Sequence, residues 1–190
     1  MPCILPHIIF IKNVYIKGFV GNLGTYILID EKYEELCSYF NKEFIDKTKK
    51  TIYDSMYKDG INPSLTICSG SVIDKEEMQN GGFLTALWKI CERNKWGIEY
   101  NLRNVPILQG TVEVANYFDI NPYRLLTKDS FIYVVEEDNY KDYISIDEKY
   151  IGQINKSKKR VRIDGESESF LTKDFKDEID KVIYKFTKRR

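Results

Sequence analysis

Hydrophobic residues recur along this chain with two spacings, one typical of strands and one typical of helices. Alternating or continuous apolar runs predict strands at residues 8–20, 25–29, 65–73, 98–102, 131–135, 150–154, 160–163 and 168–171. The run at 131–135 is apolar on both faces, which predicts a central strand of the sheet. Asp164-Gly165 stands between the last two runs and predicts a hairpin there.

Other segments carry apolar residues three and four positions apart and are predicted to be helices. Their apolar faces consist of Tyr33, Leu36, Cys37 and Phe40; Phe44, Ile45, Ile52 and Met56; Leu84, Leu87, Trp88 and Cys91; Thr111, Val114, Ala115 and Phe118; and Phe175, Ile179, Val182, Ile183 and Phe186. Their expected starts are a cap at Asp30, a cap at Asn41, the Asn80-Gly81-Gly82 segment, Pro106 in a first turn, and a cap at Thr172 or Asp174. Helices and strands are interspersed, so the sequence predicts an α+β fold in which α-helices cover a mixed β-sheet.

The length of 190 residues suits one large domain. We expect residues 1–30 to form an N-terminal strand segment packed on a domain of residues 31–190, in one compact unit. The stretch 4–11 is more apolar than one strand face requires. We therefore expect it to fold over exposed apolar surface or to pair with a second copy of the chain.

Charge and composition exclude several classes of partner and site. Lys and Arg together number 29, as do Asp and Glu, so neither nucleic acid nor a membrane is an expected partner. The basic run from Lys156 to Arg160 is interpreted as the solvated flank of a hairpin, with nucleic-acid binding as the alternative. A single histidine, His7, excludes a multi-histidine zinc site, and the four cysteines form no C-x-x-C pair. We expect reduced thiols, no membrane span and a cytoplasmic location.

Short motifs in a fixed order carry a resemblance to a known family. They are Gly21-Asn22-Leu23-Gly24-Thr25, Asn80-Gly81-Gly82 before a helix, Val105-Pro106, Asn121-Pro122-Tyr123-Arg124-Leu125, and Asp177-Glu178. In this order, over residues 17–180, the chain resembles the C-terminal domain of the aminoimidazole ribonucleotide (AIR) synthase superfamily, and most of all its AIR synthase-related and hydrogenase-maturation members.

The resemblance implies a partner domain. In the family an N-terminal domain holds most of the Mg-ATP site, the C-terminal domain closes the cleft, and ATP phosphorylates an amide or carbonyl oxygen. We expect the present chain to lack that N-terminal domain. It departs from the family pattern at Glu76-Glu77, where the family has His-Asp, at Gln79-Asn80, where it has Thr-Glu, and at Asp129, where it has a turn glycine.

The sequence therefore predicts a ligand site whose polar side chains differ from those of the family. Its residues are Asn80, Gly81, Gly82, Thr127 and Ser130, of which the last two stand where the family has S-S-G-S. Glycines at a helix N-terminus can present N–H groups to a phosphate, although they also allow close packing.

Other candidate side chains are interpreted as structural. Glu76 and Glu77 are interpreted as an exposed acidic loop, with a general-base pair or metal ligands as the alternative. Trp88 is interpreted as a core residue. No catalytic residue and no metal ligand is predicted.

The leading functional hypothesis is a stand-alone domain that acts as a binding or assembly module and is not catalytic alone. It forms a homodimer or docks on a separate ATP-binding-domain protein. The alternative is one half of an ATP-dependent synthase or maturation enzyme completed in trans, and only then are ATP and Mg²⁺ expected as cofactors. A small-ligand sensor is a third hypothesis.

Overall fold

A mixed sheet forms the centre of the molecule in a computed structural model of the chain, which describes residues 12–57, 72–136, 148–174 and 176–183. Seven strands of this part of the chain lie in the order β2-β4-β1-β5-β3-β6-β7. Their bounds are β1 Lys12–Lys17, β2 Val72–Glu77, β3 Gly97–Tyr100, β4 Phe131–Glu136, β5 Glu148–Asn155, β6 Arg160–Asp164 and β7 Ser167–Phe170. Only β3 and β6 pair in parallel; the other neighbouring strands are antiparallel. The predicted mixed sheet is confirmed, and β4 lies inside it as expected.

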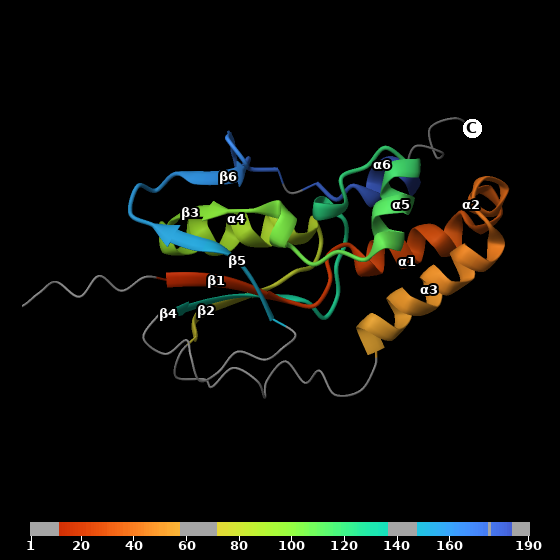
Figure 1. The fold of residues 1–190 in the computed structure, drawn as a ribbon, viewed down its shortest axis with the longest axis horizontal. Helices are drawn as coiled ribbons and strands as arrows, with labels where there is room; N and C mark the ends of the chain where they lie inside the picture. Colours follow the sequence, from red (N-terminus) through yellow and green to blue (C-terminus); the bar gives the residue numbers. More distant parts are fainter. Residues whose placement is uncertain (1–11, 58–71, 137–147, 175, 184–190) are drawn as a thin grey trace, which may run out of the picture.

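The helices gather in two places (Figure 1). They are α1 Asn22–Glu31, α2 Tyr33–Tyr39, α3 Lys42–Tyr57, α4 Gly82–Asn94, α5 Gln109–Tyr117 and α6 Ile179–Ile183, with short 3₁₀ turns η1 Leu102–Asn104 and η2 Pro122–Arg124. Helix α4 lies along the sheet, whereas α1, α2, α3, α5 and α6 lie together at one end of it. The α+β class is therefore confirmed.

Two hydrophobic clusters follow this division. The sheet cluster joins strand residues such as Val14, Ile132 and Ile98 to the buried face of α4, including Phe83 and Leu87. The helical cluster contains Leu28, Ile29, Leu36, Ile45, Ile52, Val114, Leu125, Ile179 and Val182. Each helix therefore has an apolar partner, which supplies most of the stability that helix propensity alone cannot.

The strand predicted at 25–29 is wrong, because these residues belong to helix α1. A short apolar run has the same appearance in a buried strand and in a buried helix. Here Gly21, with a φ of 70°, occupies the N-cap position of the helix. A Cβ on Gly24 would lie 2.4 Å from Leu125 Cγ, so the glycine allows α1 to approach Leu125 closely.

Several predicted boundaries also need correction. Asp30 lies inside α1, and the N-cap of α2 is Lys32. Helix α5 begins at Gln109, because Ile107 after Pro106 still forms a bridge with Val20. Leu102 opens η1 and does not continue β3.

Other predicted boundaries are confirmed, and some lie outside the described residues. Asn41 caps α3, since its side-chain oxygen accepts the Glu43 N–H at 2.8 Å. The hairpin at Asp164-Gly165 joins β6 and β7. The predictions for 4–11, His7, the strand segment 65–71, Phe175 and Phe186 fall on residues outside the described ranges.

Candidate functional site

The predicted ligand residues meet where four segments converge: the β1–α1 turn at residues 18–21, residues 79–82 at the start of α4, the η2–β4 loop at residues 125–130, and residues 177–179 at the start of α6. We call this place the junction. Gly81 and Gly82 begin α4, and the loop that holds Thr127 and Ser130 passes beside them, since the Thr127 N–H donates to Gln79 O at 3.3 Å. The β1–α1 turn and the start of α6 reach the same place through the contacts described below. Asn80 is exposed at its edge. The sequence therefore identified residues that the fold brings together.

The side chain of Asp177 lies against the N-terminal end of α4. Its Oδ2 accepts the Gly81 N–H at 2.7 Å, and its Oδ1 accepts the N–H groups of Ile179 at 3.0 Å and Leu126 at 3.2 Å. Burial raises the pKa of this carboxyl, and the three backbone donors oppose that rise. The start of α6 is also capped here, so the cap expected at Thr172 or Asp174 is corrected to Asp177. The positive end of the α4 dipole thus faces a carboxyl group of the chain itself.

Gly82 is required by the close approach of another backbone segment. Its φ is +59°, and a Cβ at this position would lie 2.6 Å from Leu125 O and 2.9 Å from Tyr123 O. Any side chain would therefore push α4 away from the η2–β4 loop. The glycine pair can be interpreted either as a phosphate site or as a means of close packing. The geometry directly supports close packing at Gly82.

The hydroxyl groups of Thr127 and Ser130 bind the β1–α1 turn. Thr127 Oγ1 accepts the Gly21 N–H at 2.9 Å and donates to Leu125 O at 2.9 Å. Ser130 Oγ donates to Phe19 O at 3.1 Å. Asn22, which the site prediction did not include, exchanges two hydrogen bonds of 2.8 Å with the backbone of Lys128. These polar groups hold the junction together.

Arg124 fixes the segment before α6. Its buried guanidinium donates to the Asp174 carbonyl oxygen and, at 2.9 Å, to Thr172 Oγ1. Thr172 and Asp174 therefore serve as acceptors for an arginine from the Asn121-to-Leu125 motif. A buried cation needs such partners, since an unpaired charge away from water is costly.

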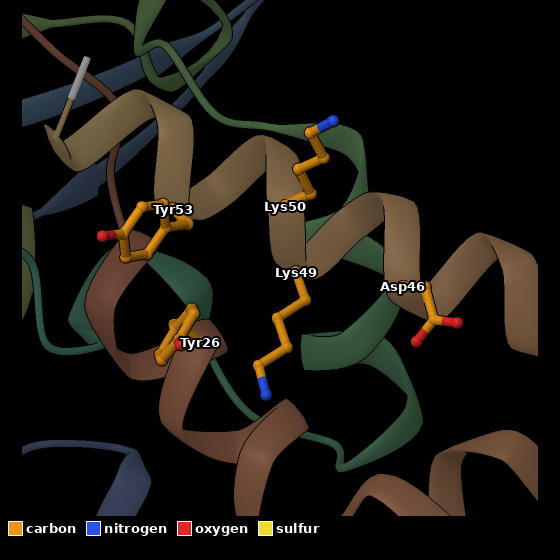
Figure 2. A pocket seen from close by; sticks show the side chains of 5 residues that line it. All are labelled: Tyr26, Asp46, Lys49, Lys50 and Tyr53. Carbon is orange, nitrogen blue, oxygen red and sulfur yellow. The ribbon is translucent and has the colours of Figure 1, made fainter. Parts of the chain in front are cut away.

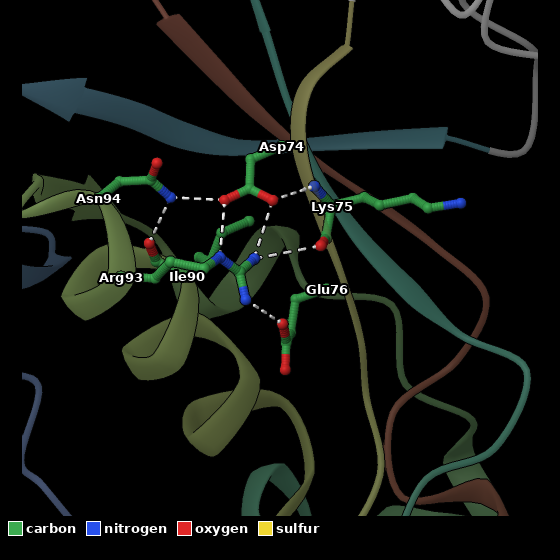
Figure 3. Close-up of polar contacts among 6 residues, drawn as sticks. All are labelled: Asp74, Lys75, Glu76, Ile90, Arg93 and Asn94. Carbon is green, nitrogen blue, oxygen red and sulfur yellow. Dashed lines mark hydrogen bonds and ion pairs between the residues drawn. The ribbon is translucent and has the colours of Figure 1, made fainter.

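Glu76 and Glu77 do not lie in an exposed loop, because both belong to strand β2. Figure 3 shows Glu76 facing α4, where Arg93 binds it at 2.8 Å and also forms two hydrogen bonds to Asp74, of 2.8 and 3.0 Å. Asn94 adds a further donor to Asp74 at 2.5 Å. These carboxylates join β2 to α4. Among the described residues no group of three or more His, Cys, Asp or Glu is placed to hold a metal ion.

Trp88 packs at the edge of the sheet cluster and is half-buried. Arg160 lies over its ring at 4.8 Å and Lys173 at 5.2 Å. Arg160 also binds Glu92 at 2.7 Å, so this member of the basic run is paired. In the described part of the chain no helix has the length and apolar character needed to cross a membrane.

A pocket of about 260 Å³ lies between α1 and α3, with Tyr26 and Tyr53 side by side (Figure 2). Lys49 points between the two helices and binds Asp30 at 2.5 Å, and its ammonium lies 5.3 Å from the Tyr26 ring. Lys50 and Asp46 complete the lining. The two lysines are balanced by Asp30 and Asp46, so the pocket has no net preference for an anion.

Comparison with solved structures shows which known proteins have a similar fold. A chain of the HypE–HypF complex matches with a TM-score of 0.60 at 17% identity, over 85% of this chain and 52% of that chain. Hydrogenase maturation protein HypE in complex with ATP matches with a TM-score of 0.60 at 13% identity, over 85% and 50%. Thiamine monophosphate kinase from Aquifex aeolicus matches with a TM-score of 0.51 at 13% identity, over 80% and 52%.

The chain therefore has the AIR synthase-like fold that its motifs implied. It spans about half the length of the solved chains that it matches. No family model and no curated protein matches the sequence.

Proposed function

We propose that this chain is a binding or assembly module with an AIR synthase-like fold and does not catalyse an ATP-dependent reaction by itself. The observation that carries this proposal is the Asp177 carboxyl group at the start of α4, 2.7 Å from the Gly81 nitrogen. A phosphate at this helix end would lose the Gly81 N–H and, once Asp177 is ionised, would meet a like charge. Thr127 and Ser130 are likewise engaged inside the chain.

The surface we propose for assembly is a group of aromatic side chains at the helical end of the molecule. This aromatic surface consists of Tyr39, Phe40, Phe44, Tyr117 and Phe118. The ring centroids of Tyr39 and Tyr117 lie 5.0 Å apart, and Tyr39 is 70% exposed. Aromatic residues are enriched at protein–protein contacts, where they bury a large area with few rotatable bonds.

We propose a second copy of the chain as the partner at the aromatic surface. The Tyr117 hydroxyl donates to Glu35 Oε1 at 3.4 Å, and the other oxygen of Glu35 lies 3.9 Å from Lys32 Nζ. Both signs of charge thus border the rings. In a two-fold contact the same patch meets itself, so opposite charges of the two copies can pair around an aromatic centre.

Replacing Tyr39 by Ser tests the assembly surface. We expect the full chain to sediment as a dimer at micromolar concentration, and Tyr39→Ser to sediment as a folded monomer whose far-UV circular-dichroism spectrum matches that of the wild type. Tyr53→Ser is the matched control, because Tyr53 is 49% exposed but lies outside the aromatic surface. A monomeric wild-type protein, or a Tyr39→Ser variant that stays dimeric, contradicts the proposed contact.

The alternative function is one half of an ATP-dependent enzyme completed in trans. It is supported by the likeness to HypE, which is known in complex with ATP and is about twice as long as the matched region. We expect the purified chain alone to show no magnesium-dependent ATP hydrolysis. Hydrolysis by the pure protein that Gly82→Asp abolishes would contradict the module proposal. Hydrolysis that requires a second purified protein would support the alternative.

A further inference from the structure

A pocket of about 600 Å³ lies beside the first half of β5. Its lining includes Arg103, residues 105–107, Lys149 and Tyr150. Small-molecule sites in proteins have volumes of roughly 300–1,000 Å³, so the pocket has room for a compact ligand. None of these residues belongs to the junction, so this pocket is separate from the proposed assembly function.

The pocket exists because β3 is shorter than β5. Strand β3 pairs with β5 only as far as Tyr100 and Gly152, after which the chain turns into η1. Asn101 makes a last hydrogen bond of 2.9 Å to Ile151 O. Residues 148–150 pair with β1 on their other edge. Among the described residues no strand continues beside them on the β3 side, and the segment from Arg103 to Ile107 forms the opposite wall.

The charges around this pocket do not balance. Arg103 and Arg162 share one carboxylate, because their Nη2 atoms lie 2.8 and 3.7 Å from Asp164. Lys149 adds an exposed ammonium group. The neighbouring Glu148 is buried and stands opposite the buried Lys17 in the strand register, so these two charges offset each other. The excess of positive charge favours an anionic group in the pocket.

The pocket also has an apolar wall beside its charged groups. Tyr150 is 43% exposed, and its ring is held edge-to-face against Tyr15 with the centroids 5.7 Å apart. The segment 105–107, Val-Pro-Ile, supplies aliphatic surface. A fixed ring and a rigid aliphatic segment can receive a flat apolar group at low entropic cost. The pocket between α1 and α3 also has aromatic walls, but its lysines are balanced by acids.

We propose that the pocket between η1 and β5 is a binding site for a small organic anion with a planar ring. The anionic group, a phosphate or a carboxylate, pairs with Arg103 and Lys149. The ring lies against Tyr150 and the segment 105–107. Both parts of the ligand are needed, because the cations are exposed and bind weakly on their own.

Titration of the full chain with defined probes tests this site. We expect 1-naphthyl phosphate to bind saturably, and inorganic phosphate and 1-naphthol to bind at least about tenfold more weakly, because each lacks one of the two contacts. A parallel titration with 1-naphthoate shows whether the site prefers a phosphate or a carboxylate. Amide chemical shifts should change at residues 103–105, at Ile107 and at residues 149–150.

Charge-removing variants locate the binding. Arg103→Gln and Lys149→Gln should each weaken 1-naphthyl phosphate about three- to tenfold, the range for one charged contact at a partly exposed site. Lys50→Gln, in the pocket between α1 and α3, is the matched control and should bind like the wild type. Melting curves verify that the variants fold. The proposal is overturned if neither naphthyl anion binds saturably, if all three variants behave alike, or if the shifts change elsewhere.

Discussion

Gly82 and Gly165 have nearly the same φ, +59° and +63°, in very different surroundings. A Cβ on Gly82 would lie 2.6 Å from a backbone oxygen, whereas a Cβ on Gly165 would meet no atom within 4 Å. Substitutions at these two glycines therefore distinguish the free-energy cost of a left-handed backbone from the cost of steric overlap.

Alanine at these two glycines should have unequal effects on stability. Gly165→Ala should lower the free energy of unfolding by about 1 kcal/mol, the cost of a left-handed alanine. Gly82→Ala should lower it by about 3 kcal/mol or more, since the backbone of the η2–β4 loop must also move. Urea denaturation measures both values. Equal losses would show that the close approach at Gly82 contributes little.

At the residue scale, the order of the motifs grouped side chains that lie together, but it did not indicate what these side chains contact. Gly81, Gly82, Thr127 and Ser130 are far apart in the sequence and lie at one junction. The role of Asp177 could not be predicted, since Gly81 lies 96 positions away and only the folded chain shows which donors the carboxyl group accepts. The structure assigns these residues internal hydrogen bonds, which no spacing rule indicates.

At the scale of elements, hydrophobic spacing predicted long helices and buried strands well and short apolar runs poorly. The stripe of α4 is clear because it continues for more than three turns. The run Thr25 to Ile29 is too short for its spacing to distinguish a helix from a strand. Leu28 and Ile29 pack in the helical cluster, and this tertiary packing favours helix α1. Strand β2 escaped recognition beyond Ile73 because charged residues, Asp74 and Glu76, occupy the face that contacts Arg93 and Asn94 of α4.

Arg93 joins β2 to the last turn of α4, and its removal should change the acid stability of the protein. Burial raises the pKa of Asp74, but hydrogen bonds from Arg93 and Asn94 outweigh that effect and lower it below 3.8. A lowered carboxyl pKa contributes stability above the unfolded value and loses it as pH falls through the folded value.

Arg93→Gln should therefore lower the free energy of unfolding by up to about 1 kcal/mol at pH 7 and by less near pH 3. Lys89→Gln, an exposed cation on the same helix, is the control and should leave stability nearly unchanged at both pH values. Urea denaturation at pH 7 and pH 3 gives the comparison. An Arg93→Gln loss that is as large at pH 3 as at pH 7 contradicts a role through Asp74.

At the scale of the whole molecule, the sheet cluster and the helical cluster are connected at the junction. Gly24 of α1 donates its N–H to Leu126 O at 2.8 Å, and Glu178 before α6 donates its N–H to Arg124 O at 3.3 Å. Leu125 belongs to the helical cluster, yet its backbone oxygen lies against Gly82 of α4. The same short loop is thus packed into both halves, and neither half can lose its structure without exposing part of the other.

The two halves should consequently unfold together, and the two tryptophans allow this to be tested. Trp88 and Trp96 both pack against the sheet cluster, whereas most helical residues lie in the helical half. Ile52→Ala removes a fully buried side chain from the helical cluster and should lower the free energy of unfolding by about 2–5 kcal/mol. Because the junction couples the halves, tryptophan fluorescence should report the same shifted urea midpoint as far-UV circular dichroism. A circular-dichroism midpoint that falls while the fluorescence midpoint stays at the wild-type value would show two independent units.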